Sequence, residues 1–143
     1  YGRDLIGAQF IGHIMRPQFQ QARVVVEDRE HPATQRLPAE FLHVEEWYSF
    51  AASPRDRGAR ILLRVDETTY EPEGWGGELR MGDDHPVVWS HCVGRGRALY
   101  SALGHRAEAY AKSEHLALLE GAVAWAAGLH GTQCEHALRP SAD

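Results

Sequence analysis

Residues 83–91 (DDHPVVWSH), continued by GRGRALY at 94–100 and LGHRAE at 103–108, carry the strongest fold signal in the chain. Val87–Trp89 and Ala98–Tyr100 have the composition of strands, and the Gly-x-Gly between them is typical of a turn. We therefore predict two neighbouring strands whose ends carry histidines and carboxylates. In open α/β sheets, ligands bind outside the carboxyl ends of strands, so this polar cluster is a candidate site.

Composition and charge exclude several classes of protein. The 143 residues make one domain or part of one, and a hydrophobic content of 43% suffices for a core. The formal net charge is −5 without a basic stripe, so we expect no nucleic-acid partner. No apolar run reaches the length of a membrane span, so we expect no membrane partner. Cys92 and Cys134 form no C-x-x-C pair, which predicts free thiols and a cytoplasmic location.

Other elements follow from hydrophobic periodicity. We predict a helix over residues 2–13, with His13 either at its C-terminal cap or acting as a ligand. Strands are predicted over 22–28 and 60–66, and the apolar centre of the second indicates burial on both faces. Residues 71–82 contain four glycines and predict a long excursion without regular structure.

The C-terminal part of the chain predicts one helix and a tail. The helix is expected to begin at a Ser113 cap and to stop at Gly128, with Gly121 allowing close approach to a sheet. Residues 129–143 show no periodicity, so we predict an irregular, frayed tail without a functional role for its histidines or Cys134.

A histidine and a carboxylate follow the second strand of the opening stretch. His105 precedes Glu108 by three residues, and a histidine oriented by a carboxylate is the base half of a nucleophilic triad. The alternative is that Glu108 only starts the next helix or loop. No serine lies in a G-x-S-x-G element and Cys92 is read as a structural thiol, so the residues do not complete a triad.

Metal binding is a second interpretation of the polar cluster. Its histidines and carboxylates are suitable ligand types, but their spacing fits no compact zinc motif. A polar pocket is therefore favoured and a divalent metal is left open. The residues concerned are His85, His91 and His105, with Asp83, Asp84 or Glu108.

Two further segments have alternative interpretations. Residues 45–48 (Glu-Glu-Trp-Tyr) suit a sugar site, because carboxylates hold hydroxyl groups and aromatic rings stack on a pyranose face. The alternative, a solvated strand edge with a half-buried Trp47, is favoured by the residues alone. His31 is predicted to order the turn that follows the first strand.

These residues together resemble the trehalose-utilisation (ThuA-like) family. The resemblance rests on residues 81–91, 94–100 and 103–108, and extends in family order to YGRDLIG at 1–7, Gly12-His13, residues 26–34, 45–48 and WAAG at 125–128. It implies a class I glutamine-amidotransferase-like fold, a flavodoxin-like α/β sandwich, over residues 1–128. Residues 103–108 look like the counterpart of the amidotransferase His-Pro-Glu element, with Glu108 one residue later. The nucleophilic cysteine is not expected, so glutaminase activity is not implied.

The resemblance also carries an expectation about completeness. Family members have an additional N-terminal half, so the chain would lack the N-terminal half of the sandwich. Its sheet would then expose an unpaired, apolar edge or face.

Read with the family, the residues predict a small-molecule sugar as partner, namely trehalose or a related disaccharide. His105 and Glu108 would be catalytic in a hydrolase or isomerase-type enzyme, and the alternative is a non-catalytic carbohydrate-binding or accessory domain. Metal use and homo-oligomerisation are left open. The expected substrate-binding residues are His13, Glu46, Trp47, Tyr48, Asp84, His85 and His91.

Overall fold

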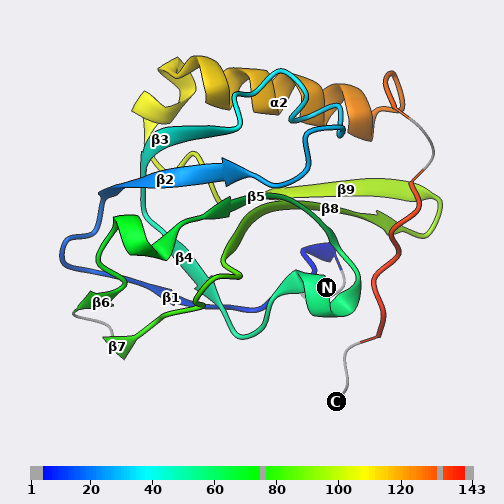
Figure 1. The fold of residues 1–143 in the computed structure, drawn as a ribbon. Coiled ribbons are helices and arrows are strands. Elements are labelled where there is room, and N and C mark those ends of the chain that lie inside the picture. The colour runs from blue at the N-terminus through cyan, green and yellow to red at the C-terminus, as the bar shows by residue number, and fades with distance from the viewer. Residues whose placement is uncertain (1–4, 75–76, 132–133, 141–143) are drawn as a thin grey trace.

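The fold is a curled antiparallel sheet with one helix on one side and a short strand pair on the other (Figure 1). The computed structural model describes residues 5–74, 77–131 and 134–140. The five-stranded sheet has the order β3-β2-β5-β8-β9. Its strands are β2 (Gln20–Val26), β3 (Glu40–Glu45), β5 (Arg60–Val65), β8 (Pro86–Val93) and β9 (Gly96–Ser101). A separate pair joins β1 (Phe10–His13) to β4 (Tyr48–Phe50), and a small hairpin joins β6 (Glu73–Gly74) to β7 (Gly77–Glu78).

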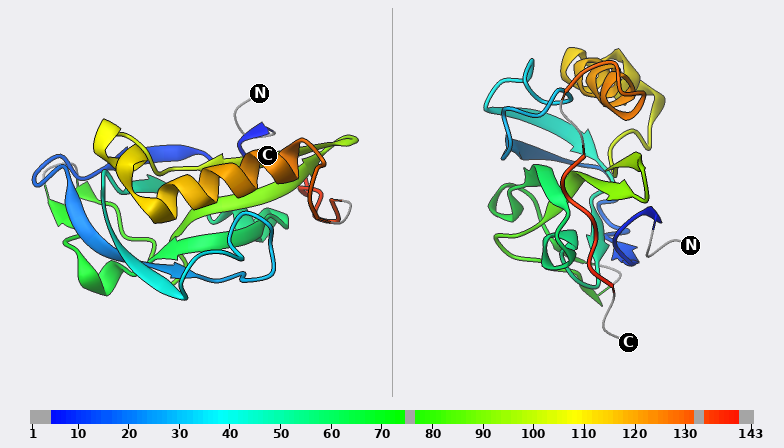
Figure 2. Two further views of the ribbon diagram at one scale, coloured as in Figure 1. Left: turned by 90° about the horizontal axis from the view of Figure 1, so that it is seen from above. Right: turned by 90° about the vertical axis from the view of Figure 1, so that its right-hand side faces the viewer.

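Short 3-10 turns and one long helix complete the chain. The turns are η1 (Pro54–Arg57), η2 (Glu67–Thr69) and η3 (Ala107–Ala111), and the helix is α2 (Ser113–Ala126). Seen from above, α2 lies along the sheet, so the core fills the space between helix and strands (Figure 2). This arrangement is a mixed α/β fold, as predicted.

The opening stretch forms the predicted pair of strands. β8 and β9 pair antiparallel, and Val93 opposite Gly96 closes the turn. Gly94 has a φ of 57°, which the tight hairpin turn requires and which glycine adopts at little cost. The strands expected over 22–28 and 60–66 are also confirmed as β2 and β5, and Ile61–Leu63 are buried as predicted.

The predicted flavodoxin-like sandwich is not confirmed, and the predicted N-terminal helix is wrong at residues 10–13. The strand pairs between described residues are antiparallel, so this part of the chain does not contain the parallel sheet of a flavodoxin-like sandwich. Residues 10–13 form β1 and not a helix, while residues 2–4 lie outside the described residues. Glycine disfavours helix, and the Phe10 ring packs on the Tyr48 ring of β4 at 4.8 Å, so tertiary contacts decide for strand.

The helix α2 differs from prediction at its start but not at its end. Its N-cap is Lys112, and Ser113 lies inside the first turn with its hydroxyl bonded to Glu114 at 2.9 Å. Gly128 has a φ of 74° and ends the helix as predicted. A Cβ on Gly121 would lie 2.4 Å from the Pro32 carbonyl oxygen, so the close approach is to a loop and not to the sheet.

The cysteines and the tail correct the sequence-based expectation. Cys92 and Cys134 form a disulfide with a Cα–Cα distance of 5.7 Å, so they are not free thiols and no longer argue for a reducing compartment. The tail is irregular but attached: the Cys92 N–H donates to the His136 carbonyl at 2.7 Å (Figure 2). The part of the tail that the structure describes is therefore not frayed. No helix within the described ranges is long and apolar enough to cross a membrane.

The edge strand β3 has one exposed and one buried face. Leu42 is 64% exposed and Val44 is also exposed, so β3 presents these two apolar side chains on its outer face. Because side chains alternate along a strand, His43 and Glu45 face inward. This alternation places the Glu45 carboxylate in the interior, next to the candidate site described below.

Candidate functional site

The carboxylate of Glu46 is the centre of a polar cluster. It is 2% exposed and lies in the link between β3 and β4. Its Oε2 lies 3.0 Å from His105 Nδ1 and its Oε1 lies 3.3 Å from His13 Nδ1. Gln18 Nε2 donates to the same Oε1 at 2.5 Å. With Tyr48, these residues are called the Glu46 cluster below.

The antiparallel topology brings these residues together from distant parts of the chain. His13 ends β1 and faces Tyr48, the first residue of β4, in the strand register. Glu46 follows β3, and His105 follows β9. Because antiparallel strands alternate in direction, ends and starts of different strands meet at one side of the molecule. The Glu46 cluster thus lies beyond strand ends, but these are ends of antiparallel strands and the cluster contains only His105 of the histidines predicted to gather there.

Aromatic rings surround the imidazole of His105. The Tyr48 hydroxyl lies 3.4 Å from His105 Nδ1, and the Phe19 ring centroid lies 5.4 Å from the imidazole. Burial and the neighbouring Glu46 carboxylate raise the pKa of Tyr48 above its ordinary value. Tyr48 is therefore a neutral phenol near pH 7 that can donate a hydrogen bond.

His85 contacts the backbone of Tyr48, a member of this cluster, from the interior. Its Nε2 lies 2.8 Å from the Tyr48 carbonyl oxygen and its Nδ1 lies 2.7 Å from Glu67 Oε1. Both partners are hydrogen-bond acceptors, so each ring nitrogen of His85 faces an oxygen. Burial raises the pKa of Glu67, but bonds from His85 and from backbone N–H groups outweigh it and leave that pKa lowered. His85 is 0% exposed and bonds to the Tyr48 backbone, so it lies behind the Glu46 cluster and not at its surface.

The orienting carboxylate of His105 is not the predicted one. Glu108 Oε1 lies 2.9 Å from Arg106 Nη2 at the surface, and its side chain is 69% exposed. Glu46 takes the place predicted for Glu108 beside the imidazole. The reason is that β3 and β4 carry Glu46 into the interior, whereas Glu108 lies in the first turn of η3 and faces solvent.

Besides His85, three more predicted substrate residues lie outside the Glu46 cluster. Trp47 is buried in the core and its Nε1 donates to the Gln20 carbonyl at 3.0 Å. Asp84 forms a surface ion pair with Arg55 at 3.0 Å. His91 is fully buried within β8, where a Cβ on Gly7 would lie 3.5 Å from its ring.

Sequence reasoning missed two residues of this region. Gln18 lies just before β2, and no local pattern marks it. The sequence marks Glu45 only as half of a carboxylate pair, yet it is 1% exposed and accepts hydrogen bonds from the backbone N–H groups of Glu46 at 3.0 Å and Gly104 at 2.6 Å. The signal that could have found it is strand alternation, which sends Glu45 inward with His43.

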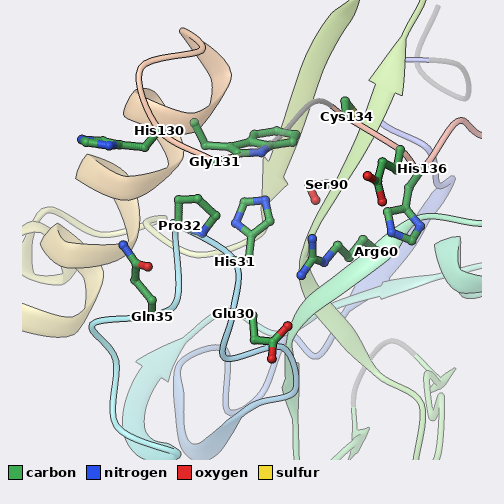
Figure 3. A pocket seen from close by; sticks show the side chains of 12 residues that line it. Glu30, His31, Pro32, Gln35, Arg60, Ser90, His130, Gly131, Cys134 and His136 are labelled. Carbon is green, nitrogen blue, oxygen red and sulfur yellow. The ribbon is translucent and has the colours of Figure 1, made fainter.

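A separate pocket lies at the other end of α2 (Figure 3). Its volume is about 420 Å³, its lining includes His31, Arg60 and Trp125, and no member of the Glu46 cluster lines it. The Ala33 N–H donates to His31 Nδ1 at 3.1 Å, which confirms that His31 orders a turn. Burial, followed by the charge of Arg60, lowers the pKa of His31 to about 4. His31 is therefore a neutral, structural histidine near pH 7.

The metal interpretation finds no donor set in the described ranges. No group of three or more His, Cys, Asp or Glu residues there could hold a metal ion. The three histidines that the spacing groups have separate surroundings. His85 bonds to Glu67, His91 lies in the interior of β8, and His105 faces the Glu46 carboxylate.

The geometry of the Glu46 cluster suits proton transfer. Glu46 accepts the Nδ1 proton of His105, which leaves Nε2 on the far side of the ring as the nitrogen that can take a proton. His105 is 41% exposed, so a ligand can reach it, while the carboxylate behind it is shielded from water. A buried carboxylate, an exposed imidazole and a phenol are together the parts of a general acid–base site.

Comparison with known proteins agrees with the resemblance in the sequence. A family model described as ThuA, trehalose utilisation, matches residues 1–126. A crystal structure of a ThuA-like protein from Bacteroides uniformis is 30% identical over 87% of this chain and 49% of that chain, with a TM-score of 0.70. A ThuA-like protein from Parabacteroides merdae shares the fold at 23% identity, over 89% of this chain and 44% of that chain, with a TM-score of 0.58. The chain thus spans about half the length of these solved structures. A search of curated proteins finds no match.

Proposed function

The chain belongs to the ThuA family, described by trehalose utilisation, and from this premise we propose that it acts on trehalose or a related disaccharide through the Glu46 cluster. The observation that carries the proposal is the buried Glu46 carboxylate 3.0 Å from Nδ1 of the exposed His105. Histidine oriented in this way is a general base through its other ring nitrogen. His105 is therefore the proposed catalytic residue.

The proposed reaction is proton transfer in a disaccharide that carries a carbonyl group, as in an isomerase: His105 takes the proton from the carbon next to the carbonyl and returns it to the neighbouring carbon. Glycoside hydrolysis typically uses two carboxylates on either side of the bond, both facing the substrate. Of the adjacent carboxylates Glu45 and Glu46, Glu45 is not suited to face a substrate in this way, because both its oxygens are bonded to backbone N–H groups in the interior. Glu46 orients the imidazole, and the Tyr48 phenol donates to a substrate oxygen.

The test compares substitutions of the two candidate orienting carboxylates. The 143-residue chain is incubated with trehalose and with a keto-disaccharide in D₂O, and proton NMR follows both product and deuterium uptake into the sugar. His105→Gln and Glu46→Gln should each slow exchange by about 100-fold or more, the usual contribution of a general base. Glu108→Gln is the matched control and should keep the parent rate. Parent-like exchange in His105→Gln would overturn the proposal.

A second candidate, a non-catalytic carbohydrate-binding domain, is favoured by one observation. Phe10 is 48% exposed and its ring packs on Tyr48 beside His13, which offers an aromatic surface for a pyranose face. Under this alternative, calorimetry detects sugar binding that Phe10→Ala abolishes, while no deuterium uptake or product occurs. Turnover by the parent chain excludes it.

A further inference from the structure

The two halves of the proposed catalytic pair come from opposite edges of the sheet. In the order β3-β2-β5-β8-β9, Glu46 follows the first strand and His105 follows the last. No ladder of backbone hydrogen bonds joins β3 to β9 in the sheet that the structure describes. The distance between Glu46 and His105 therefore depends on side-chain contacts that run between the two edges of the curled sheet, from the β3 side to the β9 side.

Glu45 makes such a crossing contact. Its Oε1 accepts the backbone N–H of Glu46 at 3.0 Å, and its Oε2 accepts the backbone N–H of Gly104 at 2.6 Å. One carboxylate thus holds the backbone that carries Glu46 and the backbone that precedes His105. Hydrogen bonds from N–H groups to a carboxylate are short and about twice as strong as neutral ones.

The surroundings of Glu45 keep its carboxylate charged and in place. His43 Nε2 lies 3.5 Å from Oε2, and both side chains are buried. Burial raises the pKa of Glu45, but the contacts with His43 and the two N–H groups outweigh it and leave that pKa lowered. Glu45 is therefore an acceptor for both N–H groups across the neutral pH range.

Gly104 is confined from its other side as well. Its φ is +105°, a left-handed conformation that glycine favours. A Cβ at this position would lie 2.8 Å from the Tyr110 hydroxyl and 3.2 Å from His115 Nε2. The backbone entering His105 is thus held between Glu45 on one side and the η3–α2 segment on the other.

We propose that Glu45 is the positioning residue of the Glu46–His105 pair, because its two carboxylate oxygens hold both backbones at the distance that pairs them. Glu45 itself does not touch substrate. What the Glu46–His105 pair does rests on the proposed function, but the role of Glu45 in holding the two residues together is tested without any sugar.

The bond itself is measured by NMR in the unmodified chain. A scalar coupling between the Gly104 amide nitrogen and the Glu45 carboxyl carbon passes only through their hydrogen bond. We expect this coupling, together with an Nδ1–H tautomer at His105. A missing coupling in the folded chain overturns the proposal, and this measurement requires no variant to fold.

Glu45→Gln then separates positioning from general support of the fold. Its amide has one acceptor oxygen in place of two, so one N–H loses its partner. Amide exchange at Gly104 or Glu46 should accelerate about tenfold or more, as expected for a lost hydrogen bond to a charged group. His105 should also lose its preference for the Nδ1–H tautomer. Glu40→Gln, on the exposed part of the same strand, is the control and should change neither.

The outcomes distinguish this proposal from the proposed function. A folded Glu45→Gln chain with the parent tautomer at His105, whatever its melting temperature, means that Glu45 is only structural and overturns the inference. A changed tautomer in a chain whose parent never turns over sugar supports positioning and refutes the sugar-acting function. Where the parent does turn over sugar, Glu45→Gln should lower kcat with little change in KM, since substrate contacts remain.

Discussion

Replacing His85 by leucine removes one partner of a buried hydrogen-bonded pair and leaves the other, the Glu67 carboxylate. His85 is 0% exposed and the Glu67 side chain 7% exposed, with 2.7 Å between Nδ1 and Oε1. Leucine fills similar space but donates no hydrogen bond. The Glu67 carboxylate then keeps only backbone donors, the N–H groups of Met81 at 2.6 Å and Gly82 at 2.9 Å. The Tyr48 carbonyl also loses its donor.

The expected loss of stability follows from these contacts. Breaking a buried pair by removing one partner costs about 3–5 kcal/mol, and the remaining backbone donors place His85→Leu near the lower end, about 3 kcal/mol. For a chain of this size, that loss lowers the melting temperature by about 10 °C. The pKa of Glu67 is lowered from 4.5 in the fold. Its contribution is therefore present above pH 4.5 and is lost as the pH falls through the folded pKa, so the difference between parent and variant should shrink in acid.

Urea denaturation at pH 7 and pH 3, followed by circular dichroism, measures this difference. The double variant His85→Leu/Glu67→Gln removes the stranded charge and should be more stable than the sum of the two single effects predicts, by about 1 kcal/mol or more. His130→Leu, at an exposed histidine, is the control and should change stability by less than about 0.5 kcal/mol. A loss below about 1 kcal/mol in His85→Leu, or strict additivity in the double variant, would refute the buried-pair reasoning.

Three further predictions concern stability. Gly121→Ala should destabilise the fold by about 1–3 kcal/mol, because its Cβ would lie 2.4 Å from a loop carbonyl. Gly128→Ala, in open space at a φ of +74°, should cost about 1 kcal/mol. A melting temperature raised by Gly121→Ala would contradict the close packing of Gly121 against the loop. His31 has a pKa of about 4 against 6.5 unfolded, so the unfolded chain binds more protons between these values and stability falls from pH 6.5 to 4. His31→Phe should reduce this fall in urea midpoints, and an equally steep fall in the variant counts against the assignment. Reduction of the Cys92–Cys134 disulfide, which closes a separation of 42 residues, should cost about 4 kcal/mol by chain entropy; a denaturation midpoint unaffected by reductant would mean that the bond does not form.

Some of the candidate site was accessible from the sequence and some was not. His13, Glu46, Tyr48 and His105 were all named from the residues and the family resemblance, and the structure brings them together. The spacing of three residues predicts Glu108 as the partner of His105, but sequence proximity does not fix the direction of a side chain. Glu46 lies far away in the sequence and becomes the neighbour only when the sheet curls.

The sequence by itself determined the features that depend on local chemistry. The β8–β9 turn follows from a glycine with positive φ, the end of α2 follows from Gly128, and β5 follows from a run of apolar residues. The family was also readable, because its motifs occur in order along the chain.

Only the tertiary structure decided the features that depend on contacts between distant residues. The antiparallel order of the sheet, the Cys92–Cys134 bond and the Glu46–His105 pair each join segments that no local signal connects. The same holds for β1, where glycines and apolar residues fit more than one local structure and pairing with β4 selects the strand. Local preferences are small, about 1 kcal/mol per residue or less, so long-range packing and buried hydrogen bonds outweigh them wherever they conflict.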